Sequence, residues 1–129
     1  MATVHVTKET FEDLLKTNDI VLLDFWAEWC GPCRMFAPVF EAASEQHPDI
    51  VFGKVDTEAE QELAGAFQIS SIPTLMIFRE RVLLLAQPGA LPAEALDQLI
   101  AQVKGLDMDE IRKEIAQQQA AQPNDEPSA

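Results

Sequence analysis

Apolar residues in this chain follow two alternating patterns. Runs of consecutive apolar residues predict strands that are buried on both faces, and segments with apolar residues three or four positions apart predict helices that cover them. The predicted order of elements is βαβαβαββα, which is typical of an α/β fold. Strands are expected at residues 3–6, 20–26, 50–55, 74–78 and 82–87, and helices after Thr7, from about Cys30 to His47, at 58–67 and at 92–103.

The link between the last two strands is short, because only Arg79-Glu80-Arg81 separates them. So short a link predicts an antiparallel hairpin. It contains no glycine, the residue that most readily adopts positive φ, so we expect a distorted turn or a turn of another type. Gly105 is placed to end the last helix, and residues 1–105 form the predicted domain.

An extra amphipathic helix is predicted at residues 106–120, after that domain. Asp107 is placed to cap it, and the strand at 82–85 is apolar at every position. One hypothesis is that the helix covers this strand, in the same chain or from a second protomer, which gives a monomer or a weak dimer. A loosely attached polar segment is the alternative. Residues 121–129 are expected to be a flexible tail. The apolar residues at helical spacing are Leu106, Met108, Ile111 and Ile115.

The charge of the chain narrows the classes of partner. Of its 129 residues, 22 are acidic and 9 are basic, which gives a formal net charge of -13. Such a charge repels nucleic acids and anionic membranes, so neither is an expected partner. No run reaches the ~18 apolar residues of a membrane-spanning helix. We therefore expect a soluble cytoplasmic protein.

Both cysteines of the chain lie in the short motif Cys30-Gly31-Pro32-Cys33. A disulfide that closes so small a loop adds little stability. The pair is therefore either a redox-active dithiol or half of a metal site. A zinc site needs two further ligands, and His5 and His47 show no paired spacing, so we expect no metal.

The predicted helix start gives the two thiols different roles. Cys30 lies where unpaired backbone N–H groups and the helix dipole favour a thiolate, which makes it the expected nucleophile. Cys33 lies three residues later on the same helical face and is the expected resolving thiol, further from water. Gly31 and Pro32 set the local geometry and thereby tune the redox potential.

Four motifs resemble the thioredoxin family, in the same order and at similar separations. The resemblance covers about residues 2–104. It implies the thioredoxin fold, a central mixed sheet of about five strands with helices on both faces, here followed by an extra C-terminal helix. It also implies a general protein disulfide reductase. The motifs are Asp24-Phe25-Trp26-Ala27-Glu28-Trp29-Cys30-Gly31-Pro32-Cys33, Lys54-Val55-Asp56, Ile72-Pro73-Thr74 and Gly89-Ala90.

Asp24 interrupts an otherwise apolar strand. If the strand is covered on both sides, burial should raise the pKa of this carboxyl. The alternative is an aspartate at the strand end that reaches solvent. The family resemblance implies that Asp24 accepts the proton of Cys33, and that Lys54 lies near the carboxylate and tunes it. Without the resemblance, Lys54 is more simply a solvated strand residue.

Pro73 opens a predicted strand, where a trans peptide bond is the ordinary expectation. The resemblance instead implies a cis proline beside the cysteines, with the backbone of Ile72 free to pair with an extended substrate segment. It also implies an apolar docking surface. Each of its residues also has a simpler interpretation: the glycines as turn residues, the prolines as residues that end an element, and the tryptophan as a partly buried core residue. They are Trp29, Gly31, Pro32, Ile72, Gly89 and Ala90.

The expected reaction needs no bound cofactor, because the electrons are carried by the Cys30–Cys33 disulfide itself. The expected partners are client proteins that contain disulfides. By resemblance, the second partner is thioredoxin reductase, which draws on NADPH. The rival hypothesis is a partner-specific redox adaptor, in which the C-terminal extension recruits one client.

Overall fold

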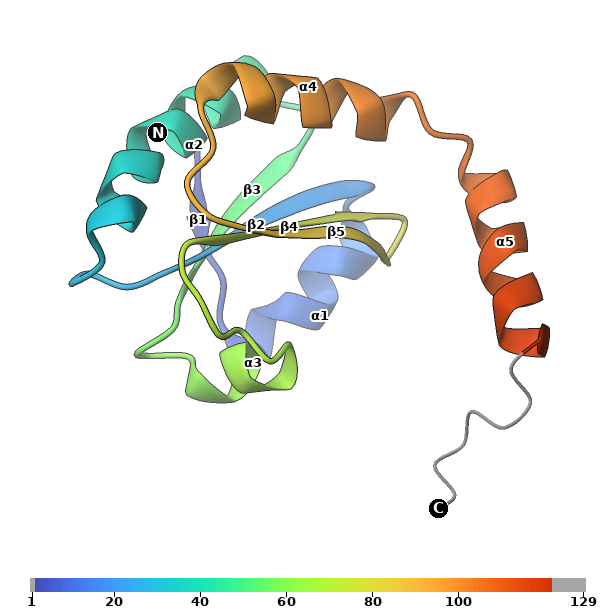
Figure 1. Cartoon of the computed structure of the whole chain (residues 1–129), viewed down its shortest axis with the longest axis horizontal. Helices are drawn as coiled ribbons and strands as arrows, with labels where there is room; N and C mark the ends of the chain where they lie inside the picture. The colour runs from blue at the N-terminus through green and yellow to red at the C-terminus, as the bar shows by residue number, and fades with distance from the viewer. Residues whose placement is uncertain (1, 122–129) are drawn as a thin grey trace.

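In the computed structural model, which describes residues 2–121, a five-stranded sheet lies between two layers of helices (Figure 1). The strand order is β1-β3-β2-β4-β5. The strands β1, β3 and β2 run parallel to one another, β4 runs antiparallel to β2, and β5 runs antiparallel to β4. This confirms the predicted mixed sheet and order of elements. The bounds are β1 Val4–His5, α1 Lys8–Thr17, β2 Ile20–Trp26, α2 Gly31–Gln46, β3 Val51–Asp56, α3 Gln61–Ala66, β4 Thr74–Arg79, β5 Val82–Pro88, α4 Ala93–Lys104 and α5 Met108–Ala121.

The central strand β2 is buried on both faces, as its unbroken apolar run predicts. Residues 20–25 are all buried, and β3 and β4 pair with the two edges of the strand. Alternate side chains point to opposite faces. Leu22 therefore joins the core under α2 and α4, and Val21 and Leu23 join the core over α1 and α3. The strand is the shared wall of two hydrophobic cores.

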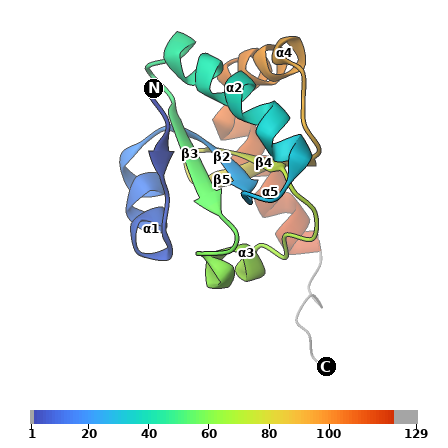
Figure 2. The ribbon, with the colours of Figure 1, turned by 90° about the vertical axis from the view of Figure 1, so that its left-hand side faces the viewer.

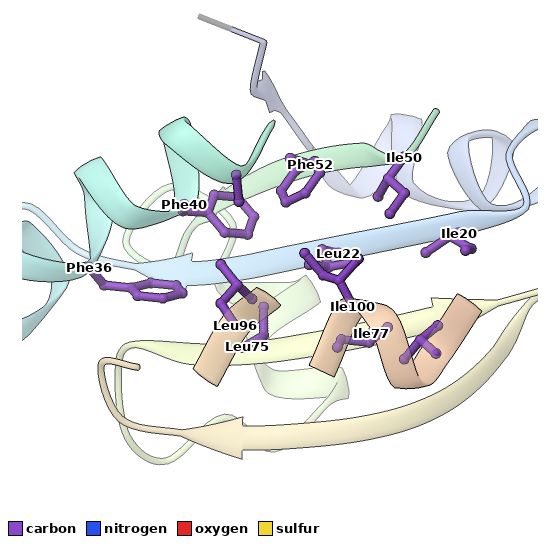
Figure 3. Close-up of a cluster of buried hydrophobic side chains, with 12 residues drawn as sticks. Ile20, Leu22, Phe36, Phe40, Ile50, Phe52, Leu75, Ile77, Leu96 and Ile100 are labelled. Carbon is purple, nitrogen blue, oxygen red and sulfur yellow. The ribbon is translucent and has the colours of Figure 1, made fainter. Parts of the chain in front are cut away.

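The first core lies between the sheet and the helices α2 and α4 (Figure 3). Phe36 and Phe40 of α2 and Leu96 and Ile100 of α4 are at most 1% exposed. The two helices lie on the same side of the sheet in both views of the ribbon (Figures 1 and 2). This packing fixes the position of α2, whose first turn carries the cysteines.

The second core is built around phenylalanine rings. Phe67 meets the rings of Phe11, Phe25 and Phe78 edge to face, at centroid distances of 5.5 to 6.1 Å. Such aromatic pairs add to the stability that comes from burial of the rings. They hold α1 and the segment after α3 against the face of the sheet opposite α2 and α4.

The helix starts use the caps that the sequence predicts, although one helix is shorter than expected. Thr7 forms a capping box with Thr10 at the start of α1. The helix predicted at 58–67 spans Gln61–Ala66 only. The reason is that the Asp56 carboxylate accepts the N–H of Glu58 at 2.9 Å, which holds the residues after β3 in a turn.

The hairpin turn has two residues in the left-handed region. Glu80 and Arg81 have φ values of 52° and 69°, so the turn takes the backbone form usually filled by glycine or asparagine. The sequence predicted a distorted or different turn for lack of glycine. Instead, surrounding contacts hold this form, because the Glu80 N–H donates to the carbonyl oxygen of Asp19 at 2.8 Å.

The C-terminal extension forms the predicted helix, α5, which continues past the end of the sheet (Figure 1). Its start is held by the hairpin. The Arg79 guanidinium donates to the carbonyl oxygens of Val103 and Leu106 at 2.9 and 3.0 Å. Glu80 forms an ion pair with Arg112. These contacts tie the junction of α4 and α5 to the turn between β4 and β5.

The apolar side of α5 is only partly covered. Met108 is 5% exposed, and Ile111 and Ile115 are half-buried. Leu83 of the apolar strand β5 stays 43% exposed. Packing of α5 over that strand therefore stays a prediction, as does the division of the chain at residue 105. The tail predicted at 121–129 lies, after Ala121, outside the described residues.

Substitution of Gly53 tests the close packing of β3 against Val6, which follows β1, and against Leu23 of β2. A Cβ at this position would lie 2.5 Å from Cγ2 of Val6 and 3.0 Å from Cδ2 of Leu23. Gly53→Ala should therefore lower the free energy of unfolding by about 1–3 kcal/mol, measured by urea denaturation. Gly65→Ala is the control, because an added Cβ there has no neighbour within 4 Å. It should raise the stability of α3 by about 0.5–1 kcal/mol. Equal effects of the two changes would contradict the steric argument.

Substitution of Arg81 tests strain in the hairpin turn. A left-handed conformation disfavours any residue with a Cβ. Arg81→Gly should raise the free energy of unfolding by up to about 1 kcal/mol, because the gain exceeds the entropy that glycine adds to the unfolded chain. Arg81→Ala removes the same side chain but keeps the Cβ, so it should not stabilise. A stabilising effect of alanine as large as that of glycine would show that the side chain, not φ, matters.

Candidate active site

The two cysteines lie where the loop after β2 enters α2. Cys30 is the N-cap residue of α2, and Pro32 lies in the first turn. Proline suits this place because its missing N–H would have no partner there. The sulfurs form a disulfide, with the two Cα atoms 5.2 Å apart. The residues that the sequence singled out as a dithiol are thus brought together by the first turn of a helix.

The sulfur of Cys30 has two polar neighbours. The backbone N–H of Cys33 donates to its Sγ at 3.1 Å, and the carbonyl oxygen of Ile72 lies 3.7 Å away. Exposure does not separate the two cysteines, since Cys30 is 4% exposed and Cys33 is 3% exposed. The sequence led us to expect that the second thiol lies further from water than the first. Both are buried in the disulfide because Trp26, Ala27 and Ile72 pack around them.

Two distant loops meet at the disulfide. The Ile72–Pro73 peptide bond is cis, the isomer that the family resemblance predicts. The N–H of Gly89 donates to the carbonyl oxygen of Pro73 at 2.8 Å, and Gly89 has a φ of 100°, which only glycine adopts readily. The segment before β4 and the segment after β5 are thereby joined beside Cys30.

The residues expected to dock substrates lie mainly at the surface. Trp29 is 68% exposed, which contradicts the alternative of a partly buried tryptophan. Its indole N–H donates to Glu58 at 3.0 Å. Gly31, Pro32, Gly89 and Ala90 are exposed, and Ile72 is half-buried.

Asp24 is fully buried in β2, the strand that leads into the loop with the cysteines. It has 0% exposure, and neither carboxylate oxygen has a hydrogen-bond partner among the described residues. Burial raises the pKa of Asp24 to about 7, and the charge of Lys54 opposes that rise. Asp24 lies on the same face of β2 as Leu22, the face that α2 covers. The alternative of an aspartate that reaches solvent is wrong.

Lys54 lies next to Asp24 in the sheet. The two residues are register partners in the parallel pair of β2 and β3. Lys54 is half-buried, and its Nζ lies 5.1 Å from the ring centroid of Trp26, so it is not a freely solvated side chain. A cavity of about 130 Å³ is lined by Lys54 together with Cys33. The full lining is Trp26, Ala27, Glu28, Cys33, Arg34, Ala37 and Lys54.

Sequence reasoning missed two surface residues near the site. Met35 is an apolar residue of the helix predicted from about Cys30 to His47, yet its side chain is 72% exposed. Its position three residues after Pro32, a residue expected on the docking surface, was the available signal. Glu58, which accepts from Trp29, had no such signal because it lies 29 residues away in the sequence.

Two further searches apply to residues 2–121 alone. Within that range, no group of three or more His, Cys, Asp or Glu side chains is placed to hold a metal ion. No helix in the same range has both the length and the apolar character that a bilayer crossing requires.

Comparison with known proteins places the chain in a family. Residues 2–102 match the family model described as thioredoxin. A relative from Streptomyces coelicolor, "Putative thioredoxin 2", is 63% identical over 119 residues, which are 92% of this chain and 89% of the relative. Since residues 1–102 supply at most 102 of these, at least 17 matched residues lie beyond the region of the family model.

One further relative is a much longer protein, and another has a solved structure. A bifunctional thioredoxin reductase/thioredoxin of Mycobacterium leprae is 48% identical over 79 residues, which are 60% of this chain and 17% of that protein. The solved structure of a mutant thioredoxin from Halobacterium salinarum aligns with a TM-score of 0.76 and 35% identity, over 81% of this chain and 93% of the other. With its cysteine pair closed at the start of α2, this chain belongs to the thioredoxin family of protein-disulfide oxidoreductases.

Proposed function

We propose that this protein is a general reductase of protein disulfides, with Cys30 as the nucleophile. One observation carries the proposal. The sulfur of Cys30 caps a helix and accepts the N–H of Cys33 at 3.1 Å, beside the cis peptide bond of Pro73. A sulfur in this position is favoured as a thiolate, because the helix N-terminus carries partial positive charge. Gly31 and Pro32 shape this turn and so tune the thiolate.

The first step is attack by the Cys30 thiolate on one sulfur of a client disulfide. A new sulfur–sulfur bond forms between Cys30 and the client, the client disulfide breaks, and the other client sulfur leaves as a thiolate. Ile72 and Pro73 border the sulfur, so an extended client segment that pairs with the Ile72 backbone is held in line. Trp29, Gly89 and Ala90 supply the exposed surface on which the rest of that segment docks.

The second step is attack by Cys33 on Cys30. Cys33 must first lose its proton, and Asp24, on the side of the sheet covered by α2, is the proposed acceptor. With a pKa of about 7, its carboxyl exchanges a proton readily near neutral pH. Lys54 keeps that pKa from rising further. The Cys30–Cys33 disulfide then forms, the bond between Cys30 and the client breaks, and the client sulfur leaves as a thiolate, so that the reduced client is released.

The oxidised protein needs an external reductant, because the Cys30–Cys33 dithiol transfers its two electrons to the client in one cycle. We propose that thioredoxin reductase, drawing on NADPH, restores the dithiol. The fusion of a thioredoxin with a thioredoxin reductase in the Mycobacterium leprae relative supports this pairing. The proposed compartment is the cytoplasm, where thiols are kept reduced.

The rival function is a partner-specific redox adaptor that recruits one client through α5. The rates at which the protein reduces several unrelated clients distinguish a general reductase from such an adaptor. A general reductase should reduce several unrelated protein disulfides, such as that of insulin, at comparable kcat/KM with a thioredoxin reductase present. An adaptor should reduce one client at least tenfold better than the others.

Serine substitutions of the two cysteines test the assigned order of attack. Cys33→Ser should accumulate a mixed disulfide through Cys30 with client proteins, detectable as a mass shift that a reductant reverses. Cys30→Ser should give no such adduct and should lose at least a thousandfold of activity in an insulin reduction assay. If the Cys30→Ser variant instead trapped the client, the two roles would be exchanged.

Replacement of Asp24 tests its buried, proton-exchanging state. In the folded protein the pKa of Asp24 is about 7, above its ordinary value of 3.8, so the neutral carboxyl stabilises the fold. This stabilisation is fully present below pH 3.8 and is lost as the pH rises through 7. Relative to the wild type, Asp24→Asn should therefore gain free energy of unfolding over that range, by roughly 2–4 kcal/mol at pH 8. The same variant should slow the second step.

The control for this pH dependence is Asp49→Asn. Lys104 lies 3.0 Å from the Asp49 carboxylate and lowers the pKa of that exposed group. Its removal should change the stability in the opposite direction with pH, and only slightly because the pair faces solvent. Parallel stability curves for the wild type and Asp24→Asn between pH 4 and 8 would refute the raised pKa.

A further inference from the structure

Of the four large apolar side chains that are exposed within residues 2–121, the two most exposed lie close to the cysteines in the sequence. Val4 and Leu83 are exposed at other places in the fold, by 45% and 43%. Trp29 and Met35 have larger exposed fractions, 68% and 72%, and both flank the Cys30–Cys33 motif in the sequence. Because single exposed apolar side chains are common on protein surfaces, the place of Met35 on its helix matters.

Met35 lies on the outward side of α2, close to the cysteines. Cys33, Phe36 and Phe40 form the buried side of this helix, while Pro32 and Met35 are both exposed. Residues three apart are neighbours on a helix surface, so Met35 continues the exposed surface that begins at Pro32. At 1.5 Å per residue it lies about 7.5 Å along the helix axis from Cys30. A client segment a few residues long reaches it.

We propose that Met35 is a client-docking residue, and that oxidation of its thioether weakens docking. This inference rests on the proposed function. A flexible, polarisable methionine side chain adapts to apolar groups of different shapes, which suits a reductase that meets many client sequences. Contact with a client removes part of its exposed side chain from water, and that burial favours association.

The thioether of Met35 is open to oxidants, in contrast to the other methionines within residues 2–121. Met76 and Met108 are 3% and 5% exposed. A peroxide transfers one oxygen atom to the sulfur: the O–O bond breaks, an S–O bond forms, and the peroxide leaves as water or an alcohol. The sulfur loses two electrons and the peroxide gains them. The sulfoxide is polar, so it no longer favours an apolar contact.

The first test compares a protein disulfide with a small aromatic disulfide, which reaches Cys30 without a flanking segment. The measured quantity is kcat/KM for the protein disulfide divided by kcat/KM for the small disulfide. In Met35→Gln this ratio should fall about three- to tenfold, mainly because KM for the protein rises. Met35→Leu should keep the wild-type ratio within twofold, because it remains apolar. Leu83→Gln makes a similar change at an exposed apolar residue on the hairpin, and its ratio should match the wild type.

The second test oxidises the disulfide form with hydrogen peroxide, since that form offers no free thiol in the active site. Peptide mass should locate one added oxygen on Met35, and the treated protein should show the same loss of ratio as Met35→Gln. Treated Met35→Leu should show none. If Met35→Gln keeps the wild-type ratio, the inference is overturned while the proposed function stands. The same holds if peroxide lowers the ratio equally in the wild type and in Met35→Leu. A wild-type protein without turnover of protein disulfides overturns both.

Discussion

The hydrogen bond from the Cys33 N–H to the sulfur of Cys30 is the contact on which the chemistry depends. It exists because a helix begins at this point, which leaves the first N–H groups without carbonyl partners. The helix is fixed in turn by Phe36 and Phe40, which are buried against the sheet. The surroundings of one sulfur are therefore set by the packing of a whole core, and any change that shifts α2 changes the stability of the thiolate.

Much of the fold follows from the sequence, because the central strands β2 and β4 are buried on both faces. The run from Ile20 to Trp26 predicts β2 with the same bounds that the structure shows. Prediction fails where a few polar contacts decide the backbone. The carboxylate of Asp56 shortens α3, and a hydrogen bond to Asp19 helps to hold Glu80 in a left-handed conformation. Such contacts join residues whose approach no local pattern reveals.

The site is less predictable than the fold for the same reason. Residue types and spacing place Cys30 at a helix start, but the cis bond at Pro73 and its link to Gly89 join segments far apart in the sequence. Only the family resemblance indicated that meeting point. Asp24 is an intermediate case. A strand covered on both sides predicts a raised pKa, yet sequence alone left open whether the carboxyl reaches solvent, and the structure excludes it.

The position of α5 bears on which function the extension can serve. Its start is held by Arg79 and Glu80, and Arg79 pairs with Ile20, the first residue of β2. Cys30 follows the other end of that strand. Seven residues of strand span roughly 20 Å. A client bound at the start of α5 would therefore have to extend along the length of the sheet to reach the sulfur. Within the described residues, α5 leaves Trp29 and the proposed docking surface around it exposed, and this favours a general reductase over an adaptor whose single client is held at α5.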